Sequence, residues 1–503
     1  MKRILCLIIA LFMVLSVVGC ANTNGPANDT DVTTAEPETE AAATTEAAAT
    51  TEAATTEGAT TEAPATEAAT TEAPTTEEAT TEPEVDIDEG LTFKTGYSRV
   101  VITPPANVYQ ARGYTAVSDD IYATCLAVND GEKTAIFISI DLQDLMPEWN
   151  DQIRNKVSSV TKVPVENIFI VVTHDHSASL YFSSNPWGFS TMVSIANTAK
   201  EAVDDLSDSK IYVGTGDTPG TAWVRCYVMP DGTTKSIHPG PGAGALRCVS
   251  DADNSLQVVR FTREDKKDIV LTNWQGHLAD AVAMPGKENT VSSDINHYLR
   301  KELEKKDDDV LSIFFAGASG NLNLNPPNET ARRYDNYIEV ARAIVKETVN
   351  VMKGMERVKA GKINITKQVY MAENAHDPAD VVAAAREAVK NGTATLNERY
   401  IVGRNENTHS DLRIAAISIG DLAFITAPYE MFDNNGVQIK EGSPFKMTVI
   451  ITNSDGAWAY MPSYEAFTEY GGYETTATYF SAGRAEELVA EYLKMLGELK
   501  AIQ

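Results

Sequence analysis

Residues 167–179 read NIFIVVTHDHSAS. The apolar run, 168–172, is rich in β-branched side chains and too short for a buried helix, so it predicts an interior strand. The run leads directly into Thr173 and then into His174 and His176, although the 503-residue chain contains only seven histidines. A His-x-His pair in this position indicates either a metal site or an ordinary polar strand end.

Other short apolar runs share this design, because each is rich in β-branched residues and ends in a polar side chain. They are TAIFISID ending at Asp141, DIVLTNWQGH at His277, LSIFFAGASGN at Asn321, LAFITAPYE at Glu430 and MTVIITNSD at Asp455. Helical patterns such as EWNDQIRNKVSSV and YIEVARAIVKETVNVMKGM lie between many of them. This alternation predicts an α/β fold, with mixed or largely parallel sheets flanked by helices in a single large catalytic domain.

The polar ends of these strands are candidates for one site, because ligands of open α/β sheets bind beyond the carboxyl ends of the strands. The side chains expected to converge are His174, His176, His277 and Glu430. A catalytic metal needs such N and O ligands on rigid supports. Each residue also has an ordinary explanation, as a core histidine or a helix-capping carboxylate. The His-x-His pair is the stronger signal, since residues i and i+2 of a strand point to the same face.

The first residues form a targeting segment rather than part of the fold. Residues 1–19 are predicted to be a lipoprotein signal peptide, with Lys2 and Arg3 followed by an apolar run. The ending VVGC resembles a bacterial lipobox, which implies lipid on Cys20. The alternative is a plain secretory signal cleaved nearby. We therefore expect the protein at the extracellular face of the bacterial membrane, anchored through Cys20.

Residues 20–90 have the composition of a disordered stalk. They repeat short Thr-Thr-Glu-Ala units with Pro and almost no large apolar side chains, so they cannot bury enough surface to offset chain entropy. From 22 to 90 there are 18 Asp and Glu and no Lys or Arg, which is most of the net charge of −29. The acidity therefore describes a self-repelling, extended tether and says little about the substrate.

The rest of the chain, 91–503, contains no second low-complexity linker, which favours one domain. Its basic residues are scattered, so nucleic acid is not an expected partner. The cysteines left after the signal and Cys20 form no Cys-x-x-Cys motif. Cys226 and Cys248 could form a disulfide outside the cell, which the sequence leaves open.

Longer motifs around these residues resemble the neutral/alkaline (non-lysosomal) ceramidase family. TGYSRVVITPP at 95–105 and THDHSAS at 173–179 match, in order, a Gly-x-x-x-x-x-Ile-Thr-Pro-Pro start and a Thr-His-Thr-His-Ser-Gly-Pro motif of that family. The likeness continues through VRCYVMPDG, NWQGHLAD, GASGNLNLNPP, APYE and AWAYMPSYEAFTEYGGYE, so it covers about residues 94–495. The domain at 91–503 thus resembles the N-terminal catalytic domain of a divergent bacterial lipoprotein member.

The resemblance implies a zinc ion held by four side chains, which are His174, His277, Glu430 and Tyr460. It also implies two catalytic residues, His176 as the proton carrier and Arg225 near the substrate carbonyl. Zn²⁺ as cofactor would activate a bound water for attack on an amide. The implied protein is a surface-anchored zinc-dependent hydrolase that cleaves an amide (N-acyl) bond in a lipid or small conjugate, so the expected partners are that substrate and the membrane.

Two departures from the family pattern concern the substrate. Asn323 occupies the position of the family's serine, and an amide cannot act as a nucleophile. Asp175 and the pair Ala178 and Ser179 replace a threonine and Gly-Pro in the paired motif. These departures argue against ceramide itself as the substrate. The alternative reading is a catalytically silent zinc-site lipoprotein that acts as a ligand-binding surface protein, with Asn323 contacting the ligand.

Overall fold

The computed structural model describes residues 87, 88, 90–180, 185–236, 244–279 and 286–503. The predicted signal peptide, Cys20 and nearly all of the predicted stalk lie outside the described residues. No described helix combines the length and the apolar character that crossing a bilayer requires.

The largest sheet has nine strands and mixed directions. In spatial order they are β14 (Val310–Ala316), β12 (Asp268–Trp274), β11 (Ser255–Arg263), β6 (Ser207–Asp217), β1 (Lys94–Val101), β3 (Tyr122–Asn129), β4 (Thr134–Ile140) and β5 (Ile168–Val172), and β16 (Glu356–Val358) pairs with β6. The pairs β12–β14 and β4–β5 are parallel, whereas the other neighbours are antiparallel. The mixed sheet expected from the sequence is confirmed.

A second sheet packs face to face on the first. Its order is β17 (Ile363–Glu373), β18 (His409–Ile419), β19 (Leu422–Thr426) and β21 (Met447–Ile451). Phe137 of the large sheet stacks on Phe169 at 5.1 Å and lies 5.1 Å from Phe424 of the second sheet, between ring centroids. The inner faces of both sheets therefore share one buried apolar cluster.

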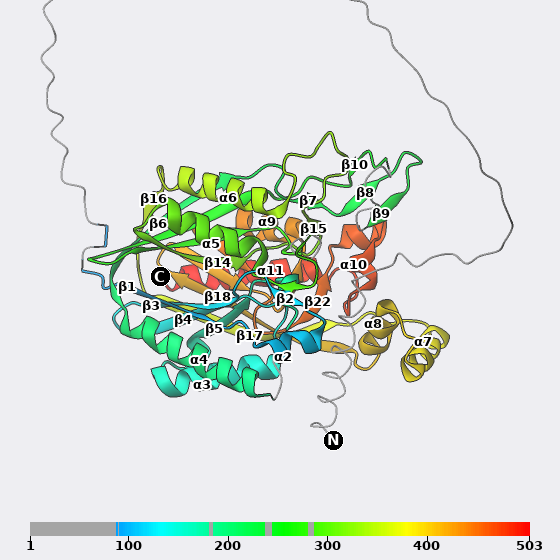
Figure 1. The fold of residues 1–503 in the computed structure, drawn as a ribbon, viewed down its shortest axis with the longest axis horizontal. Helices are drawn as coiled ribbons and strands as arrows, with labels where there is room; N and C mark the ends of the chain where they lie inside the picture. Colours follow the sequence, from blue (N-terminus) through cyan, green and yellow to red (C-terminus); the bar gives the residue numbers. More distant parts are fainter. Residues whose placement is uncertain (1–86, 89, 181–184, 237–243, 280–285) are drawn as a thin grey trace, which may run out of the picture. The chain divides into compact units, whose positions relative to one another are not determined.

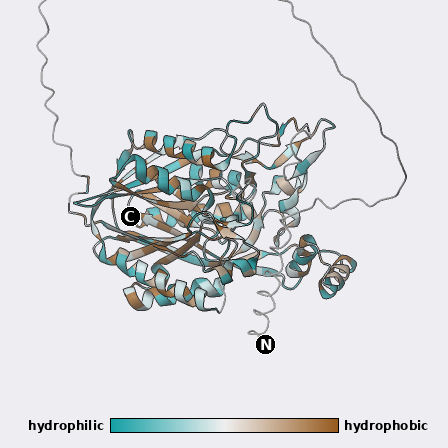
Figure 2. Cartoon of the chain, viewed as in Figure 1, coloured by the Kyte–Doolittle hydropathy of each residue, from teal (hydrophilic) through white to brown (hydrophobic). Residues whose placement is uncertain are grey.

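Helices cover the outer faces, which gives four layers. On the large sheet, α3 (Pro147–Thr161) and α4 (Pro186–Asp204) cover one half, and α5 (Asp294–Lys306) and α6 (Tyr337–Val351) cover the other. On the second sheet lie α9 (Asp433–Gly442) and α11 (Arg484–Ala501). Figure 1 shows α3 and α4 along the lower side of the body and α5 and α6 along the upper side. Figure 2 shows apolar strands enclosed by helices that alternate between apolar and polar residues. The predicted α/β class is confirmed.

The large sheet curls, and this decides where its strand ends meet. Ser139 of β4 donates to the carbonyl of Phe314 in β14 at 2.7 Å, although these strands lie near opposite ends of the strand order. Beyond β21, the backbone N of Thr452 donates to the carbonyl of Ala316 at 3.1 Å. The carbonyl of Asn453 accepts from the N of Val172 at 3.3 Å. The carboxyl ends of β5, β14 and β21, with β12 beside β14, therefore come together.

Shorter elements complete the chain. They are α2 (Ala106–Tyr109), β2 (Ala116–Val117), β7 (Trp223–Val224), β8 (Cys226–Val228), β9 (Thr234–Ser236), β10 (Arg247–Cys248), β13 (Thr290–Val291), β15 (Leu322–Asn323), α7 (Ala379–Asn391), α8 (Leu396–Arg404), β20 (Tyr429–Met431), β22 (Trp458–Met461) and α10 (Tyr473–Thr476), with the 3-10 turns η2 (Gln110–Arg112), η3 (Val165–Asn167) and η4 (His176–Ala178) and the π-helix η6 (Ala466–Tyr470). The pair α7 and α8 projects from the body (Figure 1) and has a small core of its own.

Cys226 and Cys248 are both free thiols, so the disulfide left open by the sequence is not formed.

Candidate metal centre

The paired histidines lie in a turn beyond β5. The strand ends at Val172, and His174 adopts a left-handed φ of 59° that redirects the chain. His176 begins η4, whose N-cap Asp175 accepts from the N of Ser177 at 2.8 Å. The two imidazole rings lie 4.9 Å apart at 89°. The two rings do face one site. Our reason for predicting this, the alternation of side chains along a strand, is wrong, because both histidines lie in a turn after the strand has ended.

His277 joins the pair from the end of β12. Its Nε2 atom lies 2.9 Å from Nε2 of His176, and its ring centroid lies 4.7 Å from that of His174. The three residues each offer a ligand atom, and these atoms all lie within 4.8 Å of one another. The predicted convergence of strand ends is therefore observed for the histidines, and the curled sheet is its physical cause.

Hydrogen bonds fix the tautomers of two of these rings. Nδ1 of His174 lies 3.0 Å from the carbonyl oxygen of Gln143, and Nδ1 of His277 lies 3.2 Å from that of Ser319. A carbonyl only accepts, so each Nδ1 carries a proton and each Nε2 is the nitrogen that faces the site. Metal-binding histidines have this arrangement, in which the outer nitrogen is oriented by a backbone oxygen.

His176 is oriented differently. The amide nitrogen of Gln143 lies 3.4 Å from its Nδ1. An amide NH₂ donates, which assigns the lone pair of His176 to Nδ1 and its proton to Nε2. Burial, and then the charges of His174 and Arg225, lower the pKa of His176 well below its ordinary value, so the ring is neutral. His176 thus presents an N–H donor to the site, and His277 presents a lone pair.

Glu430 supplies a carboxylate to the same place. Its Oε2 lies 3.2 Å from Nε2 of His174, and its side chain is 12% exposed. Apart from that contact, this buried oxygen has no hydrogen-bond partner among the described residues. Burial lowers the pKa of His174, but the carboxylate of Glu430 outweighs it and the pKa rises to about 9. Without a metal, a proton on His174 therefore compensates Glu430. An orphaned buried carboxylate oxygen facing ring nitrogens suits a cation.

Tyr460 and Arg225 lie beside Glu430. The strands β20 and β22 are parallel, and their register places Glu430 next to Tyr460. The guanidinium carbon of Arg225 lies 5.2 Å from the ring centroid of Tyr460. Burial lowers the pKa of Arg225, but Tyr460, Glu474 and Glu430 raise it more, so the guanidinium stays charged. The structure thus places Tyr460 next to Glu430 and Arg225 next to Tyr460.

Asn323 is held away from these contacts. Its Oδ1 accepts from the hydroxyl of Tyr227 at 3.2 Å and from the backbone N of Asn325 at 3.0 Å. Within the described chain its side chain bonds to those two residues rather than to the predicted zinc ligands. Asn323 lies in β15, which pairs with β7, and β7 ends one residue before Arg225. Asn323 is thus connected to the Arg225 segment by backbone pairing and not by its side chain.

Sequence reasoning missed several residues of the centre. Asp144 lies 3.8 Å from Nδ1 of His174, and burial is the main cause that raises its pKa to about 6. It follows Gln143 just beyond β4, so the same signal of polar residues after an apolar run could have found both. Glu474 and Tyr473 stand within the motif that contains Tyr460, but nothing in that motif marks Glu474 as the ion-pair partner of Arg225.

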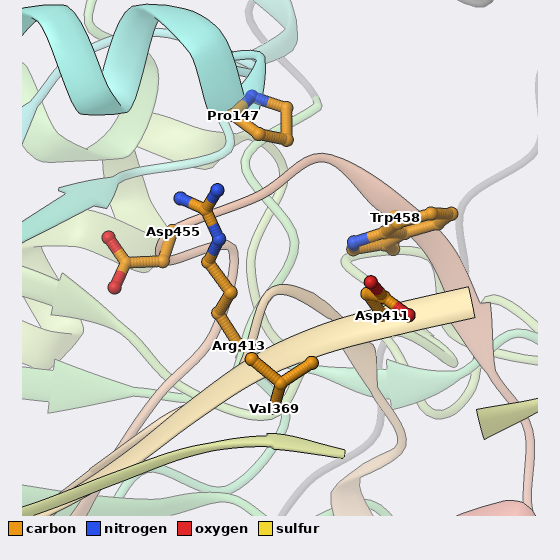
Figure 3. A pocket seen from close by; sticks show the side chains of 6 residues that line it. All are labelled: Pro147, Val369, Asp411, Arg413, Asp455 and Trp458. Carbon is orange, nitrogen blue, oxygen red and sulfur yellow. The ribbon is translucent and has the colours of Figure 1, made fainter. Parts of the chain in front are cut away.

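Two cavities of the described chain are lined by residues other than the predicted site residues. One, of about 330 Å³, is lined by Pro147, Val369, Asp411, Arg413, Asp455 and Trp458. Figure 3 shows Trp458 and Asp411 on one side of it and Arg413 and Asp455 on the other. The second, of about 720 Å³, lies along α2 and the start of α4 and includes Leu180, which follows η4.

Comparisons with known proteins place the fold but not the chemistry. No protein-family model matches the sequence, and no curated protein matches it. Solved structures do match. The neutral ceramidase from Pseudomonas aeruginosa aligns over 82% of this chain and 75% of its own, with a TM-score of 0.60 and 15% identity. A ceramidase complexed with C2 aligns over 82% of this chain and 76% of its own, with a TM-score of 0.61 and 15% identity.

The structure thus defines a mixed α/β domain with a histidine-rich centre at its converging strand ends. More specifically, the chain has a ceramidase-like fold. This agrees with the resemblance seen in the sequence motifs.

Proposed function

We propose that this protein is a zinc-dependent hydrolase that cleaves an amide (N-acyl) bond in a lipid or small conjugate, while held at the extracellular face of the membrane through Cys20. The observation that carries the proposal is a buried group of side chains suited to binding a metal. They are the imidazoles of His174 and His277, which belong to the buried histidine cluster, and Oε2 of Glu430, which lies 3.2 Å from Nε2 of His174. The ceramidase-like fold supports an amide as the bond cleaved.

The residues present fit a zinc ion. His174, His277, Glu430 and Tyr460 would hold it, giving the N and O donor set that zinc accepts. His176 also lies close to His277, with their Nε2 atoms 2.9 Å apart. Its Nε2 carries a proton, however, which suits a hydrogen-bonding role better than a ligand role. When bound, Zn²⁺ supplies an activated water near neutral pH and polarises a carbonyl oxygen.

The protein's own side chains supply the remaining functions. Nε2–H of His176 is a proton donor at the centre, suited to protonating the leaving amine. Arg225, fixed and charged beside Tyr460, is suited to stabilising the negative charge that develops on the carbonyl oxygen. Burial of His174 and His277 limits water at the centre and strengthens these interactions.

A second function is favoured by one observation. The amide of Asn323 stands where the family pattern has a hydroxyl, and its hydrogen bonds to Tyr227 and Asn325 hold it in place. A lipoprotein that binds zinc and a ligand without turnover would also have this arrangement. Substrate tests must therefore be separate from metal tests.

The experiment is metal analysis of the purified protein, together with hydrolysis of a panel of N-acyl substrates. We expect about one zinc per chain, lost in His174→Ala and Glu430→Ala. His409→Ala is the matched control, since His409 is exposed on β18. A protein that takes up no zinc would overturn the proposal. Zinc binding without turnover of any amide or ester would favour the ligand-binding alternative.

A further inference from the structure

A buried ion pair joins Arg225 to Glu474 across 249 residues of sequence. Nε of Arg225 lies 2.5 Å from Oε1 of Glu474, and the two side chains are 12% and 5% exposed. Burying two charges is costly, and removal of one partner leaves the other uncompensated. Such a pair is therefore kept in one geometry, and this geometry orients the Arg225 guanidinium.

The guanidinium of Arg225 also contacts the segments that hold the predicted zinc ligands. Its Nη2 donates to the carbonyl of Gly320 at 2.8 Å. The preceding residue, Ser319, accepts from Nδ1 of His277. The N of Gly320 donates at 2.8 Å to the carbonyl of Met431, which follows Glu430. Arg225 is thus coupled through the backbone to both the His277 and the Glu430 sides of the centre.

Two aromatic rings flank the same guanidinium. Its carbon lies 5.2 Å from the ring centroid of Tyr460 and 6.0 Å from that of Tyr473. The two rings lie 5.6 Å apart at 70°. The guanidinium fork is planar, so bonds at Nε and Nη2 together fix its plane. Within the described chain Nη1 has no hydrogen-bond partner, which leaves it as the free donor of Arg225.

We propose that Glu474 is a positioning residue, which holds the Arg225 guanidinium in the orientation that directs its free Nη1 donor to a substrate acyl oxygen. Among the described residues Glu474 hydrogen-bonds to Arg225 and not to the histidines, so in this role it acts through Arg225. This inference rests on the proposed function in one respect, which is the identity of the group that Nη1 contacts. That group is the carbonyl of an amide substrate or the carboxylate of its acyl product. Without Glu474, Arg225 would remain charged but lose its fixed plane.

A purely structural role for Glu474 predicts something else. In that case its removal would lower stability and reduce every activity in proportion to the folded fraction, whether or not Arg225 is present. A positioning role predicts that the effect disappears once Arg225 is gone, because residues that act as a unit are not additive. The two roles can therefore be separated by a double-mutant cycle.

The experiment compares wild type, Glu474→Gln, Arg225→Ala and the double variant in the full zinc-loaded protein. We expect Glu474→Gln to lower kcat on the best N-acyl substrate by about tenfold or more, with zinc content unchanged. In the Arg225→Ala background the same change should cost less than about twofold. Glu474→Asp keeps the carboxylate and should retain more activity than Glu474→Gln. Glu329→Gln, at an exposed ion pair with Arg332, is the control that should behave as wild type.

A second measurement does not require turnover. Octanoate presents the acyl carboxylate of a product, and its affinity for the zinc-loaded protein can be measured by calorimetry. We expect Glu474→Gln to weaken octanoate binding by about tenfold, again without further effect in the Arg225→Ala background. If no amide is hydrolysed by wild type but this pattern is seen, the proposed reaction fails and the positioning role stands. Full additivity with Arg225→Ala, or octanoate affinity unchanged in Glu474→Gln, would overturn it. Thermal unfolding of each variant checks that every variant is folded at the temperature of the binding and activity measurements.

Discussion

The Nε2 atoms of His176 and His277 lie 2.9 Å apart, although 101 residues separate them in sequence. Two lone pairs cannot face each other at that distance, so one nitrogen carries a proton. The contact of Gln143 with Nδ1 of His176 and that of Ser319 with Nδ1 of His277 assign this proton to His176. His277 is then the acceptor, and its Nε2 lone pair is the one that a metal would take over.

This asymmetry predicts different outcomes for the two histidines. His277→Ala should lower the affinity for zinc by more than the roughly 10–100-fold that follows when a metal ligand loses its supporting hydrogen bond. His176→Ala should keep stoichiometric zinc while losing most turnover, since it removes a proton donor and not a ligand. Zinc affinity measured by competition with a chelator checks both. Equal loss of zinc in the two variants would show instead that all three clustered histidines are ligands.

Gly320 should control metal affinity without being a ligand. A Cβ at this position would lie 2.7 Å from the carbonyl oxygen of Glu430 and 3.0 Å from that of Met431, both backbone atoms that cannot move aside freely. Gly320→Ala should therefore displace Glu430, weaken zinc binding by about tenfold or more, and cost about 1–3 kcal/mol of stability. Gly354→Ala is the control, because nothing lies within 4 Å of its added Cβ. Unchanged zinc affinity in Gly320→Ala would show that Glu430 is not held by this contact.

Asp205 should give stability that depends on pH. Burial raises the pKa of Asp205, but hydrogen bonds from Lys266, the backbone N of Tyr97 and Arg263 lower it by more. The pKa in the folded protein is therefore below the ordinary value. The unfolded chain then binds the proton more tightly, and stability rises with pH across that interval.

We therefore expect Asp205→Asn to be less stable than wild type at neutral pH. The difference should shrink as the pH falls below about 4, the ordinary aspartate pKa, and vanish below the folded pKa. Urea unfolding at a series of pH values measures this. Asp204→Asn, which removes only a surface ion pair with Lys200, is the control. A difference that stayed constant down to pH 3 would contradict the assignment.

Phe137 should be among the costliest core positions. Its ring is fully buried between the two sheets and lies within 6 Å of the ring centroids of Phe169, Phe315 and Phe424. Phe137→Ala should lower the free energy of unfolding by about 3–5 kcal/mol. Phe189→Ala, whose side chain is 46% exposed on α4, should cost about 1 kcal/mol or less. Similar losses in the two variants would mean that the sheet interface is not a close-packed core.

Local patterns were enough for much of the fold. The runs ending at Asp141, His277 and Asp455 are strands with polar residues just beyond them, as their composition predicted. Strand formation depends on side chains a few residues apart, so a single sequence contains the necessary information. The same reasoning misjudged His174 and His176, because a left-handed residue after β5 begins a turn that periodicity does not describe.

Composition and short-range periodicity were enough to predict the class of fold, the order of its strands along the chain and the residue types available at their ends. Which strand ends meet could not be predicted in this way. The curling of the large sheet brings β14 against β4, and that closure places His277 against His176. The pairing of Arg225 with Glu474 likewise joins segments that are far apart in the sequence. The tertiary structure also decided which imidazole nitrogens carry protons, because the backbone oxygens of Gln143 and Ser319 reach the rings only in the folded chain. Contacts over such separations arise from packing of whole layers, which no local pattern contains.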